Sequence, residues 1–172
     1  MDRLRITEIF LSLQGESRSV GVPTVFVRLT GCPLRCQYCD TAYAFHGGEP
    51  LLLAAILEQV AGYGVRHVTV TGGEPLAQKA CLSMLRQLCD AGYEVSLETS
   101  GAIAVEDVDP RVSKVMDFKT PGSSEAAKNR FENVQHLTAH DQVKFVICDR
   151  ADYEWSKQVT VEHRLNERCE VL

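Results

Sequence analysis

The sequence predicts an α/β fold built as an incomplete barrel of parallel strands. Two observations lead to this prediction. Short apolar stretches alternate with amphipathic helical patterns, and polar segments follow several of the apolar stretches. Strand–helix–strand units with right-handed crossovers make the strands parallel, and ligands bind where such strands end. The apolar stretches are too few for a closed eight-stranded barrel, so we expect an open one.

The elements follow in order from the first apolar stretch, residues 24–29, which is rich in β-branched side chains and ends before Gly31. A long loop over residues 31–50 comes next. Helical spacing of apolar residues and terminating glycines predict helices, and short apolar runs predict further strands. We expect helices at residues 51–63, 75–89 and 151–165, and strands at 67–71, 94–98, 114–118 and 142–147.

Length and composition predict a single domain over residues 1–172. The net charge of −5 gives no electrostatic reason to bind DNA or RNA, so no nucleic-acid partner is expected. The first residues carry no apolar run long enough for a signal peptide or a membrane span, which favours a cytoplasmic protein without a membrane partner. In that compartment the seven cysteines are expected to bind metal or act in catalysis rather than form disulfides.

Three cysteines, Cys32, Cys36 and Cys39, stand close together in the long loop with the spacing CxxxCxxC. Thiolates are soft ligands that suit iron–sulfur clusters and zinc. Three cysteines hold three corners of a [4Fe–4S] cubane and leave one iron open. A zinc site is the alternative, with Asp40 or His46 as its fourth ligand. Iron–sulfur is favoured, because no second pair of zinc ligands is found in the chain.

The cysteine spacing, with the aromatic Tyr38 before its last cysteine, resembles the signature of the radical S-adenosylmethionine superfamily. The turn Gly72-Gly73-Glu74-Pro75 resembles the superfamily's GGEP segment and follows one strand–helix–strand unit later. The resemblance implies a fold of the radical S-adenosylmethionine type. It also implies that the open iron binds S-adenosylmethionine and that one electron then breaks a carbon–sulfur bond. The protein positions and shields this cofactor chemistry.

Four segments resemble one branch, the 7-carboxy-7-deazaguanine synthase family, over nearly all of the chain: residues 10–16, 26–32, 39–41 and 117–121. The resemblance implies a lyase that converts 6-carboxy-5,6,7,8-tetrahydropterin to 7-carboxy-7-deazaguanine and releases ammonia, on the route to queuosine. It implies contacts of the S-adenosylmethionine with Gly73 and Lys119. We expect further contacts at Tyr38, Cys39, Asp40 and Glu74, and at Glu98 and Ser100, because a carboxylate and a hydroxyl at the end of a strand can bind the cofactor's ribose or amino-acid part. The implied pterin contacts are Leu13, Gln14, Gly15 and Thr71, and Thr41 is the implied Mg²⁺ ligand. We expect Glu16 beside the pterin contacts, and Arg28 is a candidate to bind the substrate carboxylate.

Several of these residues also permit a reading without a ligand. Residues 14–16 form either a pterin-pairing edge or a polar turn before the first strand. Arg28 lies in an apolar strand and needs an anion, either the substrate carboxylate or an internal partner such as Glu8 or Glu98. Asp40 and Thr41 either approach Mg²⁺ or cap a turn. Lys119 is either a cofactor contact or a solvated lysine at a strand end.

The family resemblance also suggests a homodimer and an electron donor of the flavodoxin or ferredoxin type. Two other functions are considered: a glycyl-radical-enzyme activase, which shares the cysteine motif, and a non-catalytic metal-binding module. The other four cysteines, Cys81, Cys89, Cys148 and Cys169, are expected to pack as small apolar groups. Family members continue with another strand and a short C-terminal segment that touches the pterin. This chain stops at Leu172 inside an apparent strand, so we expect a truncated barrel.

Overall fold

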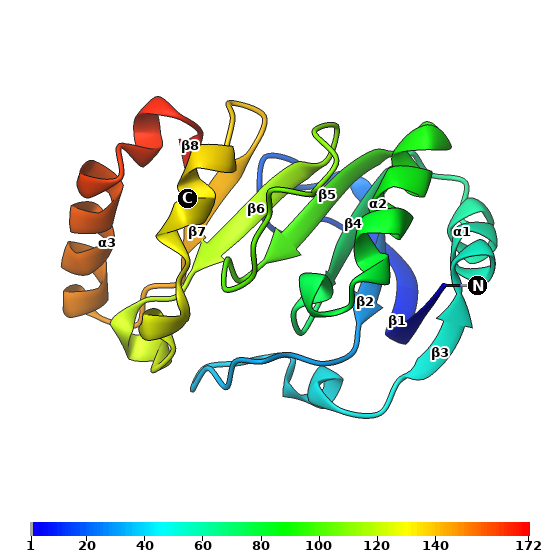
Figure 1. The fold of residues 1–172 in the computed structure, drawn as a ribbon, viewed down its shortest axis with the longest axis horizontal. Coiled ribbons are helices and arrows are strands. Elements are labelled where there is room, and N and C mark those ends of the chain that lie inside the picture. Colours follow the sequence, from blue (N-terminus) through cyan, green and yellow to red (C-terminus); the bar gives the residue numbers. More distant parts are fainter. Residues whose placement is uncertain (1) are drawn as a thin grey trace.

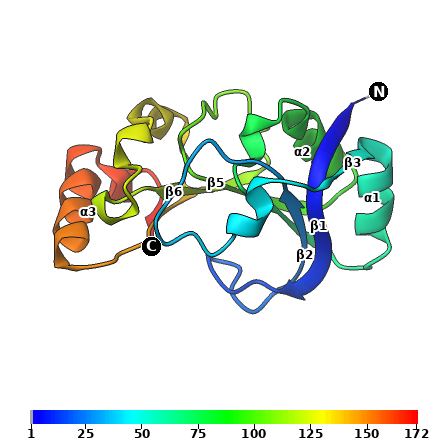
Figure 2. The same ribbon diagram turned by 90° about the horizontal axis from the view of Figure 1, so that it is seen from below.

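A computed structural model describes residues 2–172, which form one curved sheet with helices around its outside (Figures 1 and 2). The strands are β1 (Arg3–Leu13), β2 (Pro23–Leu29), β3 (Glu49–Leu52), β4 (His67–Gly72), β5 (Glu94–Thr99), β6 (Ser113–Phe118), β7 (Gln142–Phe145) and β8 (Glu170–Val171). The α-helices are α1 (Leu53–Ala61), α2 (Ala80–Asp90) and α3 (Arg150–Glu162). Across residues 2–172, every helix is too short or too polar to cross a membrane.

Short 3₁₀ helices occupy several of the connections: η1 (Ala42–Phe45), η2 (Pro75–Ala77), η3 (Pro121–Ser123), η4 (Ala126–Lys128), η5 (Phe131–His136) and η6 (Leu165–Glu167). The first follows the cysteine loop, and the second begins at the proline that ends the GGEP turn. The expected helix over residues 75–89 is therefore divided into η2 and α2.

The sheet has the order β3-β1-β2-β4-β5-β6-β7-β8 and remains open between its two edges, β3 and β8. Strands β2, β4, β5, β6, β7 and β8 are parallel, which confirms the predicted α/β fold with an incomplete barrel. Strand β1 is antiparallel to both β2 and β3. The final strand β8 lies where the sequence predicted a strand to open.

Two strands were not predicted, β1 and β3. The sequence analysis started the sheet at residue 24 and assigned residues 51 and 52 to a helix, which instead begins at Leu53. In β1 the buried Leu4 and Ile6 alternate with the exposed Arg3 and Arg5, which is the period of a half-buried strand. Strand β3 is short and forms by pairing with β1, a contact between segments distant in sequence.

The outer face of the sheet is apolar and packs against the helices. It carries Val25, Val27, Leu29, Val68, Val70, Val95, Leu97, Met116, Phe118, Val143 and Phe145, all buried. Helices α1 and α2 add residues such as Ile56 and Leu85 to the same core. Cys81 and Cys169 are buried as predicted, Cys89 is half-buried, and Cys148 is exposed, contrary to the prediction.

The inner face of the parallel strands is mostly polar, because every second residue in these strands points away from the core. Its members are Thr24, Phe26, Arg28, Thr69, Thr71, Ser96, Glu98, Val115, Asp117, Gln142 and Lys144. Parallel strands are ordinarily apolar on both faces. A polar inner face therefore indicates that the inside of this barrel holds polar ligands rather than packed side chains.

Candidate active site

A cavity of about 540 Å³ lies at the carboxyl ends of the parallel strands. The ends of β2, β4, β5, β6 and β7 and the loop that carries the cysteines contribute to its walls. Every residue that the sequence analysis placed at the site lines this cavity, with the exception of Glu74. The structure thus brings these side chains together at the predicted edge of the sheet, and the role of each one stays a prediction.

Three free, half-buried thiols face the cavity: Cys32, Cys36 and Cys39. Burial raises the pKa of Cys32 and of Cys36 above the ordinary thiol value, and Lys119 partly offsets this effect at both. Buried thiolates are unfavourable without a compensating cation, and metal coordination supplies one. Cys32 and Cys36 are therefore protonated thiols at neutral pH in the absence of a metal, and a bound metal would supply the positive charge that their thiolates need.

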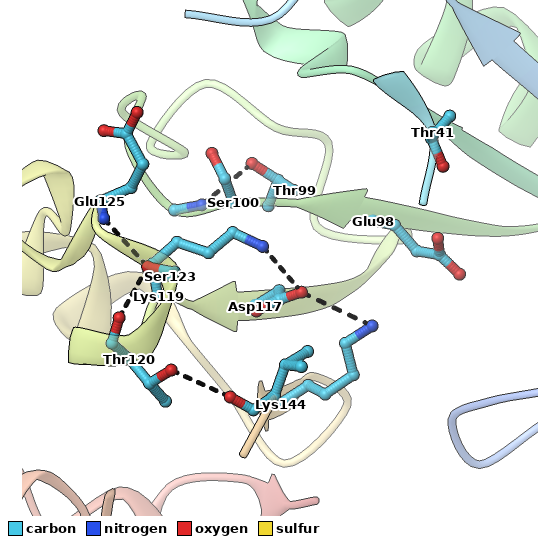
Figure 3. A network of polar contacts seen from close by, with 12 residues as sticks. Thr41, Glu98, Thr99, Ser100, Asp117, Lys119, Thr120, Ser123, Glu125 and Lys144 are labelled. Carbon is cyan, nitrogen blue, oxygen red and sulfur yellow. Dashed lines mark hydrogen bonds and ion pairs between the residues drawn. The ribbon is translucent and has the colours of Figure 1, made fainter. Parts of the chain in front are cut away.

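The cysteine loop is anchored by the segment that follows β6. The amide of Gln37 donates to the carbonyl of Ser123 at 3.1 Å, and the amide of Arg35 donates to the Glu125 carboxylate at 2.5 Å. Figure 3 shows Ser123 and Glu125 on their turn beside Lys119. These contacts hold the middle of the cysteine loop against the segment that follows β6.

Two glycines let the turn after β4 press against the start of the cysteine loop. The amide of Gly73 donates to the carbonyl of Leu29 at 3.2 Å, and the amide of Glu74 donates to the carbonyl of Gly31 at 2.8 Å. A Cβ atom on Gly73 would lie 2.2 Å from the Gly31 oxygen, and one on Gly72, whose φ is 145°, would lie 2.2 Å from the Leu29 oxygen. Both positions therefore require glycine.

Glu74 is fully buried and hydrogen-bonds to the end of the next strand, β5. Its carboxylate accepts hydrogen bonds from the Thr99 hydroxyl at 3.0 Å and from the Ser100 amide at 2.8 Å, and also from the Ser100 hydroxyl. The amide of Leu76 donates to the same group at 3.0 Å. Glu74 does not line the cavity; in this structure it holds Ser100, which does.

Two lysines approach Asp117 from different sides (Figure 3). The Lys119 Nζ lies 3.0 Å from Asp117 Oδ2, and the Lys144 Nζ lies 3.6 Å from the same oxygen. Burial is the largest single effect on both lysines and works against their charge, but Asp117 and the other acidic groups nearby together raise the pKa of Lys119 and of Lys144. Both ammonium groups are therefore charged at neutral pH.

Two buried side-chain oxygens lack a hydrogen-bond partner within residues 2–172, Tyr38 Oη and Asp117 Oδ1. Both residues line the cavity. Buried polar atoms in proteins nearly always have a partner, so an unpaired one beside a cavity points to a polar ligand. Asp117 Oδ1 would accept a hydrogen bond from a donor group of that ligand.

Arg28 forms an internal ion pair of the kind that the sequence left open. Its Nε lies 2.7 Å from Glu8 Oε1, and the hydroxyl of Tyr43 donates to the same oxygen at 2.8 Å. Within the described chain the Nη atoms of Arg28 make no hydrogen bond, and the residue lines the cavity. Glu8 therefore orients the guanidinium and leaves its outer edge free for an anion.

Four further residues predicted at the site are hydrogen-bonded to one another in two pairs. The Thr71 hydroxyl donates to Glu98 Oε2 at 2.8 Å, and the Thr41 hydroxyl donates to Asp40 Oδ1 at 2.7 Å. Glu98 thus accepts one neutral hydrogen bond and keeps acceptor capacity for a ligand. Asp40 and Thr41 present hard oxygen atoms side by side, as a Mg²⁺ ion requires.

Several cavity residues were not singled out from the sequence, among them Asp117, Lys144, Phe10 and Phe26. The rings of Phe10 and Phe26 stack with their centroids 5.1 Å apart and both line the cavity. One sequence signal could have found two of these residues. Asp117 and Lys144 each alternate with the buried apolar residues of their own strand.

The donor set fits a [4Fe–4S] cluster with bound S-adenosylmethionine. The three thiols of one short loop suit three irons of a cubane, and the cavity beside them has room for a larger ligand. That cavity has carboxylates and hydroxyls at the strand ends and two buried oxygens without partners. A molecule with amino, carboxylate and hydroxyl groups satisfies such an environment.

Comparison with protein families defines the class of protein. A family model described as "Radical SAM superfamily" matches residues 26–117, more than half of the chain. The chain therefore belongs to the radical SAM superfamily, whose members use a [4Fe–4S] cluster and S-adenosylmethionine.

Curated relatives then define the family within that class. The 7-carboxy-7-deazaguanine synthase of Koribacter versatilis is 44% identical over 169 residues, which cover 96% of this chain and 74% of the relative. The protein of the same name from Chlorobaculum tepidum is 39% identical over 172 residues, 98% of this chain and 78% of the relative. The chain belongs to the 7-carboxy-7-deazaguanine synthase family. These relatives do not favour an activase or a non-catalytic metal-binding module.

Two solved structures have a similar fold. The crystal structure of QueE from Escherichia coli superposes with a TM-score of 0.65 at 21% identity, covering 99% of this chain and 94% of that one. The crystal structure of archaeal TYW1 has a TM-score of 0.60 at 10% identity, covering 86% of this chain and 64% of that one. At these identities the likeness supports the fold alone.

The contact between the glycine turn and the cysteine loop leads to a first prediction. In Gly73→Ala, the new methyl group would collide with the Gly31 carbonyl and with Cys32 Cβ, 2.8 Å away, and displace the first cysteine. We expect a loss of about 1–3 kcal/mol in stability, as for overpacking elsewhere, and reduced iron content after anaerobic reconstitution. Thermal unfolding and iron analysis measure the two effects.

The matched control is Gly15→Ala, because a Cβ at Gly15 meets nothing within 4 Å. This variant should keep the melting temperature and the iron content of the unmodified protein. Normal iron content and normal stability in Gly73→Ala would contradict the role assigned to the glycine turn.

Proposed function

We propose that the protein converts 6-carboxy-5,6,7,8-tetrahydropterin to 7-carboxy-7-deazaguanine with release of ammonia, using a [4Fe–4S] cluster and S-adenosylmethionine. The observation that carries the proposal is the polar cavity at the strand ends beside three half-buried cysteines. Membership of the 7-carboxy-7-deazaguanine synthase family supports the same reaction. The route to queuosine is the expected setting.

Residues on one side of the cavity would hold the cofactors. Cys32, Cys36 and Cys39 would bind the cluster, and reductive cleavage of S-adenosylmethionine there supplies the radical that starts the reaction. Tyr38, Asp40, Gly73, Glu98, Ser100 and Lys119 are the proposed contacts of the S-adenosylmethionine. Glu74 supports this set indirectly, because its buried carboxylate holds the Ser100 amide at the cavity wall.

Residues on the other side of the cavity would hold the pterin. We propose contacts with residues 13–16, with Arg28 and with Thr71, all of which line the cavity. Arg28 would bind the substrate carboxylate through its Nη atoms while Glu8 holds its Nε. The stacked rings of Phe10 and Phe26 offer an aromatic surface beside these contacts.

A Mg²⁺ ion is proposed at Thr41, with Asp40 beside it. The support is their adjacent oxygen atoms at the cavity wall, 2.7 Å apart, and the family resemblance. Substrate oxygens and water would complete the coordination, so the ion would bind together with the pterin.

The partners are proposed from the family resemblance and the charge. We propose electron delivery by a flavodoxin or ferredoxin type protein, a homodimer, and a cytoplasmic location. The net charge of −5 supports the absence of a nucleic-acid partner.

The decisive test is turnover by the reconstituted protein. After anaerobic cluster assembly, incubation with S-adenosylmethionine, a reductant, Mg²⁺ and 6-carboxytetrahydropterin should yield 7-carboxy-7-deazaguanine, 5′-deoxyadenosine and ammonia, detected by mass spectrometry and an ammonia assay. Cys36→Ala should abolish the products, whereas Cys81→Ala, which changes a cysteine buried in the core, should keep the cluster. Cofactor cleavage without conversion of the pterin would contradict the proposed substrate.

A second experiment addresses Arg28. Replacing it with lysine exchanges a planar fork for a single ammonium group, so one charge-assisted hydrogen bond to the carboxylate is lost. The expected result in Arg28→Lys is a pterin KM about one to two orders of magnitude higher, from a loss of about 1.5–3 kcal/mol. Cleavage of S-adenosylmethionine without pterin should persist. An unchanged pterin KM would mean that Arg28 serves only its ion pair with Glu8.

A further inference from the structure

The connection between β1 and β2, residues 14–22, crosses the open side of the barrel; we call it the strap. In the sheet β2, β4, β5 and β6 separate β1 from β7, yet the strap contacts β7 and β8 directly. The upper part of the strap borders the site cavity, at the carboxyl ends of the parallel strands. Its lower part borders a second cavity of about 470 Å³ at the amino ends of the same strands. The strap therefore closes the gap that the sheet leaves open.

The upper contact of the strap is an ion pair beside the site. The Lys144 Nζ on β7 lies 2.5 Å from Glu16 Oε2 in the strap. The Lys144 side chain is 21% exposed and also contacts Asp117, whereas the Glu16 side chain is 58% exposed, so the lysine is the fixed member of this pair. Attraction to Asp117 and Glu16 keeps its pKa above the ordinary lysine value despite burial. The contact therefore persists throughout the neutral range.

The lower contact of the strap lies at the second cavity. The amide of Arg18 donates to Gln142 Oε1 at 3.1 Å, and the Arg18 guanidinium pairs with Glu170 at 3.1 Å. About half of each charged side chain in this pair is exposed, at 52% and 44%. Exposed ion pairs contribute little, so this contact alone does not fix the upper part of the strap.

The upper part of the strap carries Gln14 and Gly15, which are proposed to bind the pterin. The amide of Glu16 donates to Gln14 Oε1 at 3.2 Å, and Gln14 Nε2 donates to the Thr69 hydroxyl at 3.1 Å. Glu16 is thus bonded to Lys144 through its side chain and to Gln14 through its backbone. A displacement of Glu16 would remove the hydrogen bond that orients the Gln14 side-chain amide, while the Gln14 backbone stays bonded to Val22 and Gly21.

We propose that Lys144 is a positioning residue that holds the strap, through Glu16, in the conformation that binds the pterin. The inference rests on the proposed function for the identity of the ligand. Strand β7 would thus contribute to substrate recognition through an ion pair that crosses the open side of the barrel.

The test compares Lys144→Met with Glu16→Gln, each of which removes the ion pair and keeps the length of the side chain. Each is expected to raise the pterin KM about tenfold, the loss of one charge-assisted contact, with a smaller change in kcat. Cleavage of S-adenosylmethionine without pterin should continue in Lys144→Met. Hydrogen exchange of the apo protein should become faster at residues 15–17 and stay unchanged in the core strand β4.

The double variant shows whether Lys144 acts through Glu16. If it does, the KM of the double variant equals that of the weaker-binding single variant; if the two effects multiply, the proposal is wrong. Lys157→Met is the matched control, because Lys157 pairs with Glu154 on the exposed surface of α3. An unchanged KM and unchanged strap exchange in Lys144→Met, in a protein that converts the pterin, would also overturn the proposal. Failure of the unmodified protein to convert the pterin would instead overturn the proposed function.

Discussion

The contact between the ends of β2 and β4 is the constraint on which the rest of the site depends. Two backbone hydrogen bonds join the glycine turn to Leu29 and Gly31, at a distance that excludes any side chain on Gly73. The cysteine loop starts from this contact, and the buried carboxylate of Glu74 continues it to the end of β5. The turn at Gly72 and Gly73 and the Glu74 that follows it thus set the position of the cysteine loop relative to Ser100.

The two faces of the sheet have different roles: the outer face stabilises the fold, and the inner face lines the cavity. Apolar residues on the outer face bury against the helices and supply most of the hydrophobic stabilisation. The inner face keeps polar and charged side chains that would be costly in a packed core, and they surround the cavity. The charges are largely paired internally, as in the Asp117 pairs with Lys119 and Lys144. A ligand therefore meets an arrangement of charges that is already oriented, which lowers the cost of binding.

Local patterns in the sequence predicted the parallel strands, the helices and the cysteine loop, because each depends on residues close together in the chain. The placement of cavity residues at strand ends followed from the geometry of parallel sheets. The pair between Glu16 and Lys144 could not be predicted, because it joins segments 128 residues apart across an open barrel. The strand β3 was not predicted for a similar reason: its pairing with β1, a distant segment, outweighs the helical pattern of residues 51 and 52.

We infer that the loop held by the glycine turn would present a [4Fe–4S] cluster with one iron open to S-adenosylmethionine, facing the polar cavity. The most direct measurement is electron paramagnetic resonance of the reduced, reconstituted protein before and after addition of S-adenosylmethionine. We expect the spectrum of a [4Fe–4S] cluster that changes on addition, because the amino and carboxylate groups replace the ligand at the open iron. A cluster spectrum that S-adenosylmethionine leaves unchanged, or the absence of a [4Fe–4S] signal, would contradict the claim.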